Sequence, residues 1–357
     1  MNSKDKKWTH LHTWNEILSQ AEVWKGVLQM LRRSAPAERI IDTSSDQREW
    51  LFVGCGTSFY LAEAAALSWT LLTSLPARAI PASEILLFPG LLAADSQKQA
   101  VVISRSGRTS EAVRAARVLR EELRIATLGV TCAKNSELEQ ICSESIVLSA
   151  ADENSTVMTR SFTSMLLCLQ FLGAKRAGKL QFIERMETMA EELAPRVRTI
   201  AAEVEAFVHR TEFEDYVFLG QGPFHGIARE AALKVMEMSC SYSQVFHTLE
   251  FRHGPKAIVT PATCLTFFLS ETAQKEEAEV LSEMKELGGA TVAICNRAGE
   301  TIQQASDLVV QMDTAGDELA LLAPYTVPCQ LMGFFTGLRK GLNPDEPKNL
   351  TRVVILD

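Results

Sequence analysis

The sequence predicts an α/β protein that contains two copies of one parallel-sheet unit. Two observations lead to this prediction: short apolar runs of strand length alternate with longer helical patterns, and the pattern of the first half returns in the second. Such alternation is typical of a parallel sheet with helices on its two faces, a doubly wound arrangement. With 357 residues, the chain is long enough for two domains of ordinary size.

Eight segments are predicted to be strands, four in each half. They are residues 50–54, 100–104, 126–131 and 145–148, then 216–220, 263–270, 290–295 and 308–311. Gly54 and Gly220 are 166 positions apart, as are Ser104 and Ser270. The runs ATLGVT at 126 and ATVAIC at 290 are 164 positions apart. So constant an offset favours a duplicated unit over a chance likeness between apolar strands.

Helical patterns surround these strands. The N-terminal arm, from Trp8 to about Asp46, carries apolar residues at helical spacing, among them Trp14, Ile17, Leu18, Ala21, Trp24, Leu28 and Leu31. A long helical stretch over residues 162–209 joins the halves, and Pro195 predicts a break in it. The tail, residues 342–357, is a polar turn followed by a short apolar run.

The composition narrows the range of partners and compartments. A net charge of −8 argues against a nucleic acid or an anionic membrane as partner. The eight cysteines form no C-x-x-C pair, which favours reduced thiols in the cytoplasm and no zinc site. The N-terminus lacks the apolar core of a signal peptide, and residues 61–75 are too short and too polar to span a bilayer. We therefore expect a cytoplasmic protein with neither partner.

The first candidate site is the segment Ser104–Glu111, which follows a predicted strand and opens a helix. It places four hydroxyls and one glycine at the turn, where the helix leaves backbone N–H donors free and its dipole favours an anion. A plain helix cap would need only one hydroxyl. The sequence therefore predicts an anion site in this loop, whose neutral hydroxyls could surround a phosphate.

A second loop, Gly54–Ser58, also lies between a strand and a helix. Its G-x-G lacks the third glycine of a nucleotide-binding loop, so that interpretation is weak. Because ligands collect at the carboxyl ends of parallel strands, Thr57 and Ser58 are expected to face the same anion.

The third candidate is a predicted helix over Arg229–Ser241. Glu230, Lys234, Glu237 and Ser241 fall on one face of it, and the remaining positions are largely apolar. A charged stripe on a buried helix requires partners or a site. The alternative is a solvated stripe with Glu–Lys pairs, which is usual on surface helices.

His253 lies in the segment EFRHGP, and a histidine beside Gly-Pro is expected to be exposed and able to shuttle protons. A structural role is the alternative, since most lone histidines are structural. The spacing of His247 and His253 does not match a metal motif, and the other histidines stand alone.

Taken together, these motifs resemble the SIS (sugar isomerase) family, above all the isomerase half of glucosamine-6-phosphate synthases. The resemblance extends over about residues 40–357. The motifs in order are CGTS (55–58), ASE (82–84), SRSGRTSE (104–111), TRSFT (159–163), EAALKVME (230–237), EFRHGP (250–255) and NPDEPKNL (343–350).

The resemblance implies two SIS domains, each a five-stranded parallel sheet flanked by helices. It divides the chain into an N-terminal helical arm (1–46), a first SIS domain (47–190), a second SIS domain (205–342) and a tail that closes on the active site (343–357).

The resemblance also implies roles for single residues. Ser104, Ser106 and Thr109 would bind the phosphate of the sugar, with Thr57 and Ser58 beside them and Arg105 supplying a backbone donor. Glu237 would move the proton between C1 and C2, supported by Lys234 and Glu230. His253 would open the sugar ring from a neighbouring subunit, so a homodimer with a shared active site is expected.

Two departures from the synthases change the expectation. The residue after Met1 is Asn2 and not a cysteine, so no glutaminase activity is expected. The position of the tail lysine that forms a Schiff base holds Arg352, which cannot act as that nucleophile. Arg352 remains a candidate phosphate ligand.

We therefore expect a stand-alone ketose/aldose isomerase or amino-sugar-phosphate deaminase. Its substrate would be a hexose or amino-hexose 6-phosphate. No metal and no organic cofactor is expected. The alternative is a non-catalytic sugar-phosphate sensor, which would need the phosphate loop but not the charged helix or His253.

Overall fold

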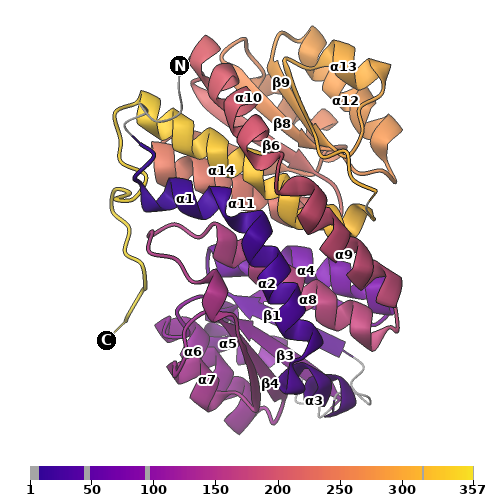
Figure 1. Ribbon diagram of the computed structural model, residues 1–357. Helices are drawn as coiled ribbons and strands as arrows, with labels where there is room; N and C mark the ends of the chain where they lie inside the picture. Colours follow the sequence, from indigo (N-terminus) through magenta and orange to yellow (C-terminus); the bar gives the residue numbers. More distant parts are fainter. Residues whose placement is uncertain (1–7, 44–48, 93–96, 316, 357) are drawn as a thin grey trace. The chain divides into compact units, whose positions relative to one another are not determined.

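A computed structural model describes residues 8–43, 49–92, 97–315 and 317–356 (Figure 1). Two five-stranded sheets, each wholly parallel, form its framework, with strand orders β2-β1-β3-β4-β5 and β10-β9-β8-β6-β7. Read from the opposite edge, the second order repeats the first. The predicted duplicated α/β architecture is thereby confirmed. Residues 1–7 and 44–46 of the expected arm lie outside the described residues.

The first sheet contains the four strands that the sequence predicted and one that it did not. Its strands are β1 (Glu49–Gly54), β2 (Ala77–Pro81), β3 (Lys98–Ile103), β4 (Ala126–Thr131) and β5 (Glu144–Val147). β2 was missed because it is an edge strand in which only Ile80 is buried. Such a strand lacks the apolar run on which the prediction relied.

The second sheet also contains the four predicted strands and one strand that was not predicted. Its strands are β6 (Asp215–Gly220), β7 (Tyr242–Phe246), β8 (Thr263–Phe268), β9 (Ala290–Cys295) and β10 (Leu308–Gln311). β7 was missed because it is a partly exposed edge strand. β8 ends at Phe268, two residues earlier than predicted, so Ser270 belongs to the loop that follows.

Three helices form the N-terminal arm, and three more follow the first sheet. The arm consists of α1 (His12–Leu18), α2 (Gln20–Arg32) and α3 (Ala35–Thr43). The later helices are α8 (Arg160–Arg176), α9 (Leu180–Leu193) and α10 (Val197–Arg210). The break predicted at Pro195 is confirmed. A second break, at Gly178 with φ +66°, was not predicted.

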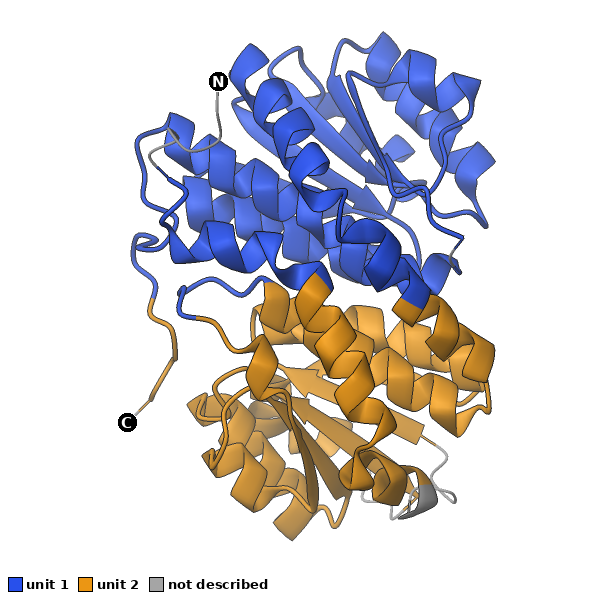
Figure 2. Cartoon of the chain, viewed as in Figure 1, with its two compact units in different colours: residues 1–21, 154–159, 188–350 blue, residues 22–153, 160–187, 351–357 orange. Residues whose placement is uncertain are grey.

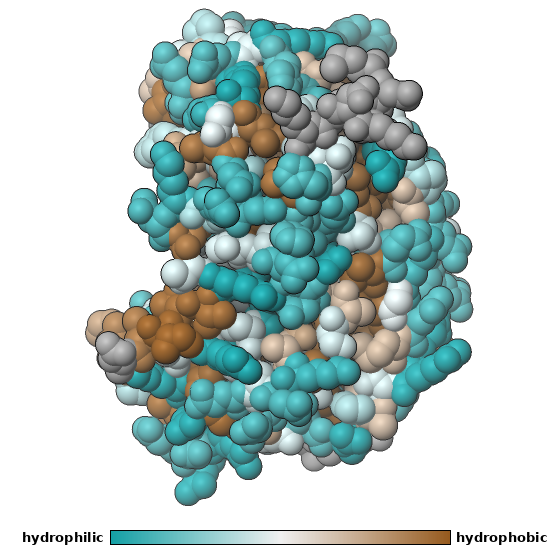
Figure 3. All heavy atoms as spheres, turned by 60° about the vertical axis from the view of Figure 1, so that its left-hand side comes forward, coloured by the Kyte–Doolittle hydropathy of each residue, from teal (hydrophilic) through white to brown (hydrophobic). Residues whose placement is uncertain are grey.

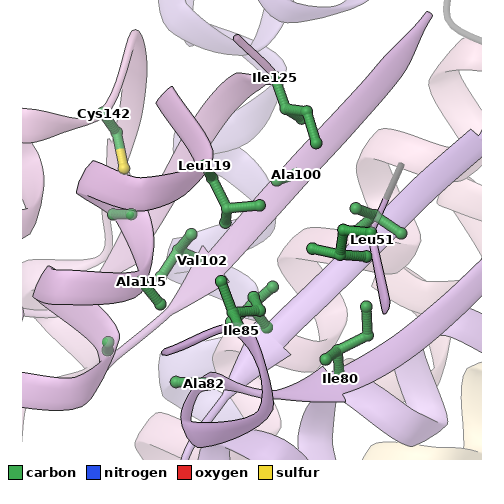
Figure 4. Close-up of a cluster of buried hydrophobic side chains, with 14 of the residues drawn as sticks. Leu51, Ile80, Ala82, Ile85, Ala100, Val102, Ala115, Leu119, Ile125 and Cys142 are labelled. Carbon is green, nitrogen blue, oxygen red and sulfur yellow. The ribbon is translucent and has the colours of Figure 1, made fainter. Parts of the chain in front are cut away.

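The remaining helices cover the sheets in equivalent ways. They are α4 (Thr57–Thr73), α5 (Ala82–Leu87), α6 (Ser110–Arg117) and α7 (Glu137–Ile141) beside the first sheet. Beside the second are α11 (Pro223–Ser239), α12 (Gln274–Glu286), α13 (Glu300–Ala305) and α14 (Leu322–Arg339). α4 packs against α8, and α11 packs against α14. Buried side chains of the first sheet and of its helices, among them Leu51, Val102 and Leu119, form one apolar core (Figure 4).

Among the described residues, one stretch, Glu318–Arg339, is long and apolar enough to cross a membrane by length and composition alone. Its most apolar 18-residue window is entirely buried inside the structure, and the stretch includes the core helix α14. On the face seen in Figure 3, hydrophilic side chains predominate, and the apolar ones gather in several groups, one of which projects from the surface.

The chain divides into two compact units, each containing one sheet (Figure 2). The sheet-1 unit comprises residues 22–153, 160–187 and 351–357, and the sheet-2 unit comprises 1–21, 154–159 and 188–350. Both ends of the chain therefore belong to the unit whose sheet is more distant in sequence.

The turns after β1 and β6 require glycine, because the following helix begins directly against the strand end. A Cβ on Gly54 would lie 2.4 Å from the backbone of Ser58, and one on Gly220 would lie 2.4 Å from the carbonyl oxygen of Phe224. We predict that Gly54→Ala and Gly220→Ala each lower the free energy of unfolding by about 2 kcal/mol or more, measured by chemical denaturation.

Gly26 is the matched control, since it lies within α2 and a Cβ there would meet nothing within 4 Å. Gly26→Ala should raise stability by about 0.5–1 kcal/mol through helix propensity. Equal effects of all three substitutions would contradict this account of the turns.

Candidate active site

The loop between β3 and α6, residues Ser104–Thr109, is called the Ser104 loop below. It leaves the carboxyl end of a strand in the middle of the sheet, where ligands bind in open parallel sheets. Its hydroxyls lie close together: the Oγ of Ser104 is 3.3 Å from the Oγ1 of Thr109, and the Oγ of Ser106 accepts from the N–H of Arg108 at 3.2 Å. Gly107, at φ +59°, leaves no room for a Cβ beside Ser136.

Thr57 and Ser58 occupy the first turn of α4, directly after β1. β1 is the neighbour of β3 in the sheet, so both loops emerge at the same edge. Both residues are buried. The structure therefore places the predicted hydroxyl ligands at the carboxyl ends of neighbouring strands of the first sheet.

A buried ion pair lies beside the Ser104 loop. The Nη1 of Arg105 is 3.5 Å from the Oε2 of Glu153, and both side chains are almost wholly buried. Glu153 also accepts hydrogen bonds from the N–H and the hydroxyl of Ser161. Glu153 was not predicted, because it is a single acidic residue in a loop and no periodic pattern marks it.

The tail reaches the same region of the sheet-1 unit. The carbonyl of Val354 accepts from the N–H of Ser110 at 3.2 Å, and the N–H of Leu356 donates to the Oγ of Ser110 at 2.9 Å. Arg352 pairs with Asp152 at 2.9 Å, and its carbonyl accepts from Arg105 at 3.0 Å. The end of the chain thus runs beside the first turn of α6.

The charged stripe on α11 is buried. Lys234 lies between Glu230, whose Oε1 is 3.4 Å from its Nζ, and Glu237, to which it donates a hydrogen bond. The side chains of Glu230 and Lys234 are 0% and 1% exposed, which makes the alternative of a solvated stripe wrong. Glu237, at 16%, is the member of the three that reaches solvent.

Ser241 is not part of this stripe, contrary to the prediction. α11 ends at Ser239, and Cys240 adopts the left-handed conformation at the helix end. The Oγ of Ser241 instead accepts from the Nζ of Lys340 at 2.7 Å.

Electrostatics keep Lys234 charged. Burial by itself would lower the pKa of this ammonium, but the attraction of Glu230 and Glu237 outweighs burial and raises the pKa. In this stripe the buried Lys234 ammonium orients two carboxylates, and the carboxylate of Glu237 is the one accessible from solvent.

His253 is exposed, as predicted, and follows a short 3₁₀ helix, Glu250–Arg252. His225 and His247, to which no role was assigned, stack on each other with ring centroids 3.9 Å apart. Burial, together with the nearby His247 and Arg229, lowers the pKa of His225 to about 4. The pair was missed because the two residues are distant in sequence and share no motif.

The predicted catalytic residues Glu230, Lys234, Glu237 and His253 all lie in the sheet-2 unit, and the predicted phosphate ligands all lie in the sheet-1 unit. Within the described ranges, no group of three His, Cys, Asp or Glu side chains is arranged to hold a metal ion.

Comparison with known families identifies the fold. A family model of the SIS domain matches residues 45–175 and 214–335, which is more than half of the chain. The chain belongs to the SIS domain family. The two matched segments coincide with the two parallel sheets, so each half is one SIS domain.

Curated relatives and solved structures agree with this assignment. The glutamine–fructose-6-phosphate aminotransferase of Methanothermobacter thermautotrophicus is 24% identical over 94% of this chain. That of Pyrobaculum aerophilum is 27% identical over 90%. The chain spans 54% of the length of each of these two relatives, about half.

Among solved structures, glucosamine-6-phosphate deaminase from Thermotoga maritima has a TM-score of 0.79 and 28% identity. The alignment covers 97% of this chain and 100% of that one. Tagatose-6-phosphate ketose/aldose isomerase from Escherichia coli has a TM-score of 0.86 and 20% identity. There the coverage is 99% of this chain and 98% of that one.

Lys234→Met leaves two carboxylates on α11 without their buried cation. We predict a fall of about 3–5 kcal/mol in the free energy of unfolding, because an uncompensated buried charge is strongly destabilising. Adding Glu230→Gln should recover part of the loss. Urea denaturation measures both, and a Lys234→Met variant as stable as the wild type would contradict the account of the stripe.

The His225 imidazole predicts a pH dependence of stability. Its pKa of about 4 in the folded chain lies below the unfolded value near 6.5, so the unfolded state binds more protons between these values. This group therefore makes stability fall as the pH drops from about 6.5 to 4. His225→Gln should flatten that part of the stability–pH profile, whereas an unchanged slope would exclude the effect.

Proposed function

We propose that this protein is a ketose/aldose isomerase of a hexose or amino-hexose 6-phosphate. The support is the combination of a hydroxyl-rich loop at a helix N-terminus with a partly exposed carboxylate on a buried charged helix. An aldose–ketose shift needs these two elements, an anchor for the phosphate and a base beside the carbon acid. Membership of the SIS family and the sugar-phosphate enzymes among its structural neighbours support the same activity.

In this proposal the phosphate binds at the carboxyl edge of the first sheet. Ser104, Ser106 and Thr109 donate hydroxyl hydrogens to it, and Arg105 contributes its backbone N–H. Thr57, Ser58 and Arg352 complete the ligands, and the tail closes on the bound sugar. The contacts of Val354 and Leu356 with Ser110 support this role of the tail.

Glu237 is the proposed base. Its carboxylate takes the proton from C2 of the open-chain aldose while O1 gains a proton, and the electron pair of the broken C–H bond forms the C1=C2 double bond of an enediol. The carboxylate then returns its proton at C1, and O2 loses its proton to become the carbonyl oxygen of the ketose. Lys234 holds the carboxylate in place, and Glu230 balances the charge of Lys234.

His253 is the proposed acid–base group for opening the sugar ring. It is exposed, which suits a residue that serves a site formed with a second copy of the chain. We therefore propose a homodimer with a shared active site. The cysteine pattern supports action in the cytoplasm.

A second candidate activity is deamination of an amino-hexose 6-phosphate. It is favoured by the 28% identity to the Thermotoga maritima deaminase over nearly the whole of both chains. The same proton shift converts a 2-amino aldose into a ketose imine at C2, and one water then hydrolyses the imine to ketone and ammonia.

The buried Glu230–Lys234–Glu237 stripe is the observation that favours an enzyme over a sensor. Burying these charges is costly, and a protein that only bound sugar phosphates would not need them.

Glu237→Gln tests the base directly. The amide is nearly isosteric but accepts no proton, so kcat should fall by about a thousandfold while substrate still binds. The assay is a panel of hexose 6-phosphates with their 2-amino and N-acetyl forms, in which ketose and ammonia are followed separately. Unchanged turnover would remove Glu237 as the base, and binding without turnover in the wild type would establish a sensor.

Ser106→Ala tests the phosphate ligand. Losing a hydrogen bond to a charged group should weaken binding of each phosphorylated substrate about tenfold to a hundredfold, and to a similar degree for all. Calorimetric titration with the same panel gives the comparison. A loss confined to one sugar would place Ser106 against the sugar and not against the phosphate.

A further inference from the structure

The second sheet carries a loop in the same topological position as the Ser104 loop. Residues Ser270–Ala273 lie between β8 and α12, as the Ser104 loop lies between β3 and α6. Ser104 and Ser270 play the same part in the two loops, since the Oγ of each accepts from the backbone N–H three residues later, that of Gly107 at 3.2 Å and that of Ala273 at 3.0 Å. With these serines aligned, Glu271 corresponds to Arg105 and Thr272 to Ser106. Duplication therefore provides two loops of the kind that can bind an anion.

In the second loop, the molecule's own carboxylate occupies the anion position. The Oε2 of Glu318 accepts from the backbone N–H of Glu271 at 2.8 Å and from that of Thr272 at 3.0 Å. Its Oε1 accepts from the hydroxyl of Thr272. Two successive backbone donors and a hydroxyl on one anion are the contacts that a phosphate would make in such a loop.

The corresponding donor in the first loop is open. Within the described part of the chain, the backbone N–H of Ser106 has no hydrogen-bond acceptor. The carboxylate that corresponds to Glu318 is Glu153, 165 positions earlier and likewise ahead of the last helix of its half. Glu153 instead contacts the guanidinium of Arg105 and bonds to Ser161.

The residue after the loop serine accounts for this difference. Arg105 attracts Glu153 with a buried guanidinium, whereas Glu271 carries the same charge as Glu318 and cannot hold it. The side chain of Glu271 itself accepts from Asn296 at 2.7 Å. Glu318 is thus left to bond to the backbone of its loop.

We propose that Arg105 is a positioning residue that holds Glu153 away from the backbone N–H of Ser106 and so keeps the Ser104 loop open to phosphate. In the second half Glu318 closes the equivalent loop, so that each chain binds one phosphate. This inference rests on the proposed function, because it assumes that the Ser104 loop is the phosphate site.

The first test is binding of inorganic phosphate to the full-length protein by calorimetric titration. The wild type should bind one phosphate per chain, and Arg105→Ala should bind it about tenfold or more weakly, because Glu153 is released towards the loop. The double variant Arg105→Ala/Glu153→Gln should recover most of that loss. A merely structural role of Arg105 would not produce recovery through a second substitution.

Arg114→Gln is the matched control. Arg114 also donates to a tail carbonyl, that of Leu356, at 3.3 Å, but its side chain is exposed whereas that of Arg105 is buried. Its phosphate affinity should stay within about twofold of the wild type. Wild-type affinity in Arg105→Ala, or a folded double variant that binds no better than Arg105→Ala, would overturn the inference.

The second test does not depend on the folding of the Arg105 variants. Burial raises the pKa of Glu277, which accepts from Ser270 at 2.7 Å, to about 7, so pH 6 reduces repulsion at the second loop. At pH 6, inorganic sulfate should raise the Tm of the double variant Ser106→Ala/Glu318→Ala by more than it raises the Tm of Ser106→Ala alone. Equal sulfate responses of the two folded variants would overturn the closure by Glu318.

The two levels of the argument fail differently. If the wild type does not bind phosphate, or Ser106→Ala does not weaken its binding, the proposed function falls and this inference with it. If phosphate binds at Ser106 but the Arg105 series shows no recovery, only the role of Arg105 is overturned.

Discussion

Backbone N–H groups in the loops after the central parallel strands need acceptors from outside the helix that follows. The two halves of this chain meet that need in different ways, and the functional differences between them follow from it. Each central strand, β3 and β8, ends in a loop that opens a helix, where donors have no partner within the helix. In the second half a carboxylate accepts from the loop backbone, whereas in the first half the N–H of Ser106 has no acceptor among the residues that the structure describes. The duplication is therefore symmetric in fold and asymmetric in chemistry.

Each unit buries a group of charged side chains at its proposed functional site. Arg105 and Glu153 form one buried pair in the sheet-1 unit, and the stripe on α11 forms another group in the sheet-2 unit. Buried ion pairs contribute little to stability compared with apolar packing, so their presence needs another explanation. The proposed roles, positioning a phosphate loop in one unit and a catalytic carboxylate in the other, would supply one.

Much of the fold could be predicted because it follows from local patterns. The apolar runs predict the central strands, and the similar offsets of 164 to 166 positions between three pairs of strands predict the duplication. The edge strands β2 and β7 could not be predicted, since they are half-exposed and lack an apolar run. The hydroxyls of the Ser104 loop and the stripe of Glu230, Lys234 and Glu237 were also visible in the sequence. Glu153 and Glu318 were not, because their roles arise only when distant segments meet.

The central claim is that a sugar phosphate anchored in the Ser104 loop exchanges hydrogen between C1 and C2. The most direct measurement uses hexose 6-phosphates and their 2-amino forms that carry deuterium at C2. NMR follows the position of the deuterium while the protein is present. The account predicts that the deuterium of at least one sugar leaves C2, appearing at C1 of the ketose or in water. The account would be contradicted if the sugar phosphates saturated the site and the deuterium of every one of them stayed at C2.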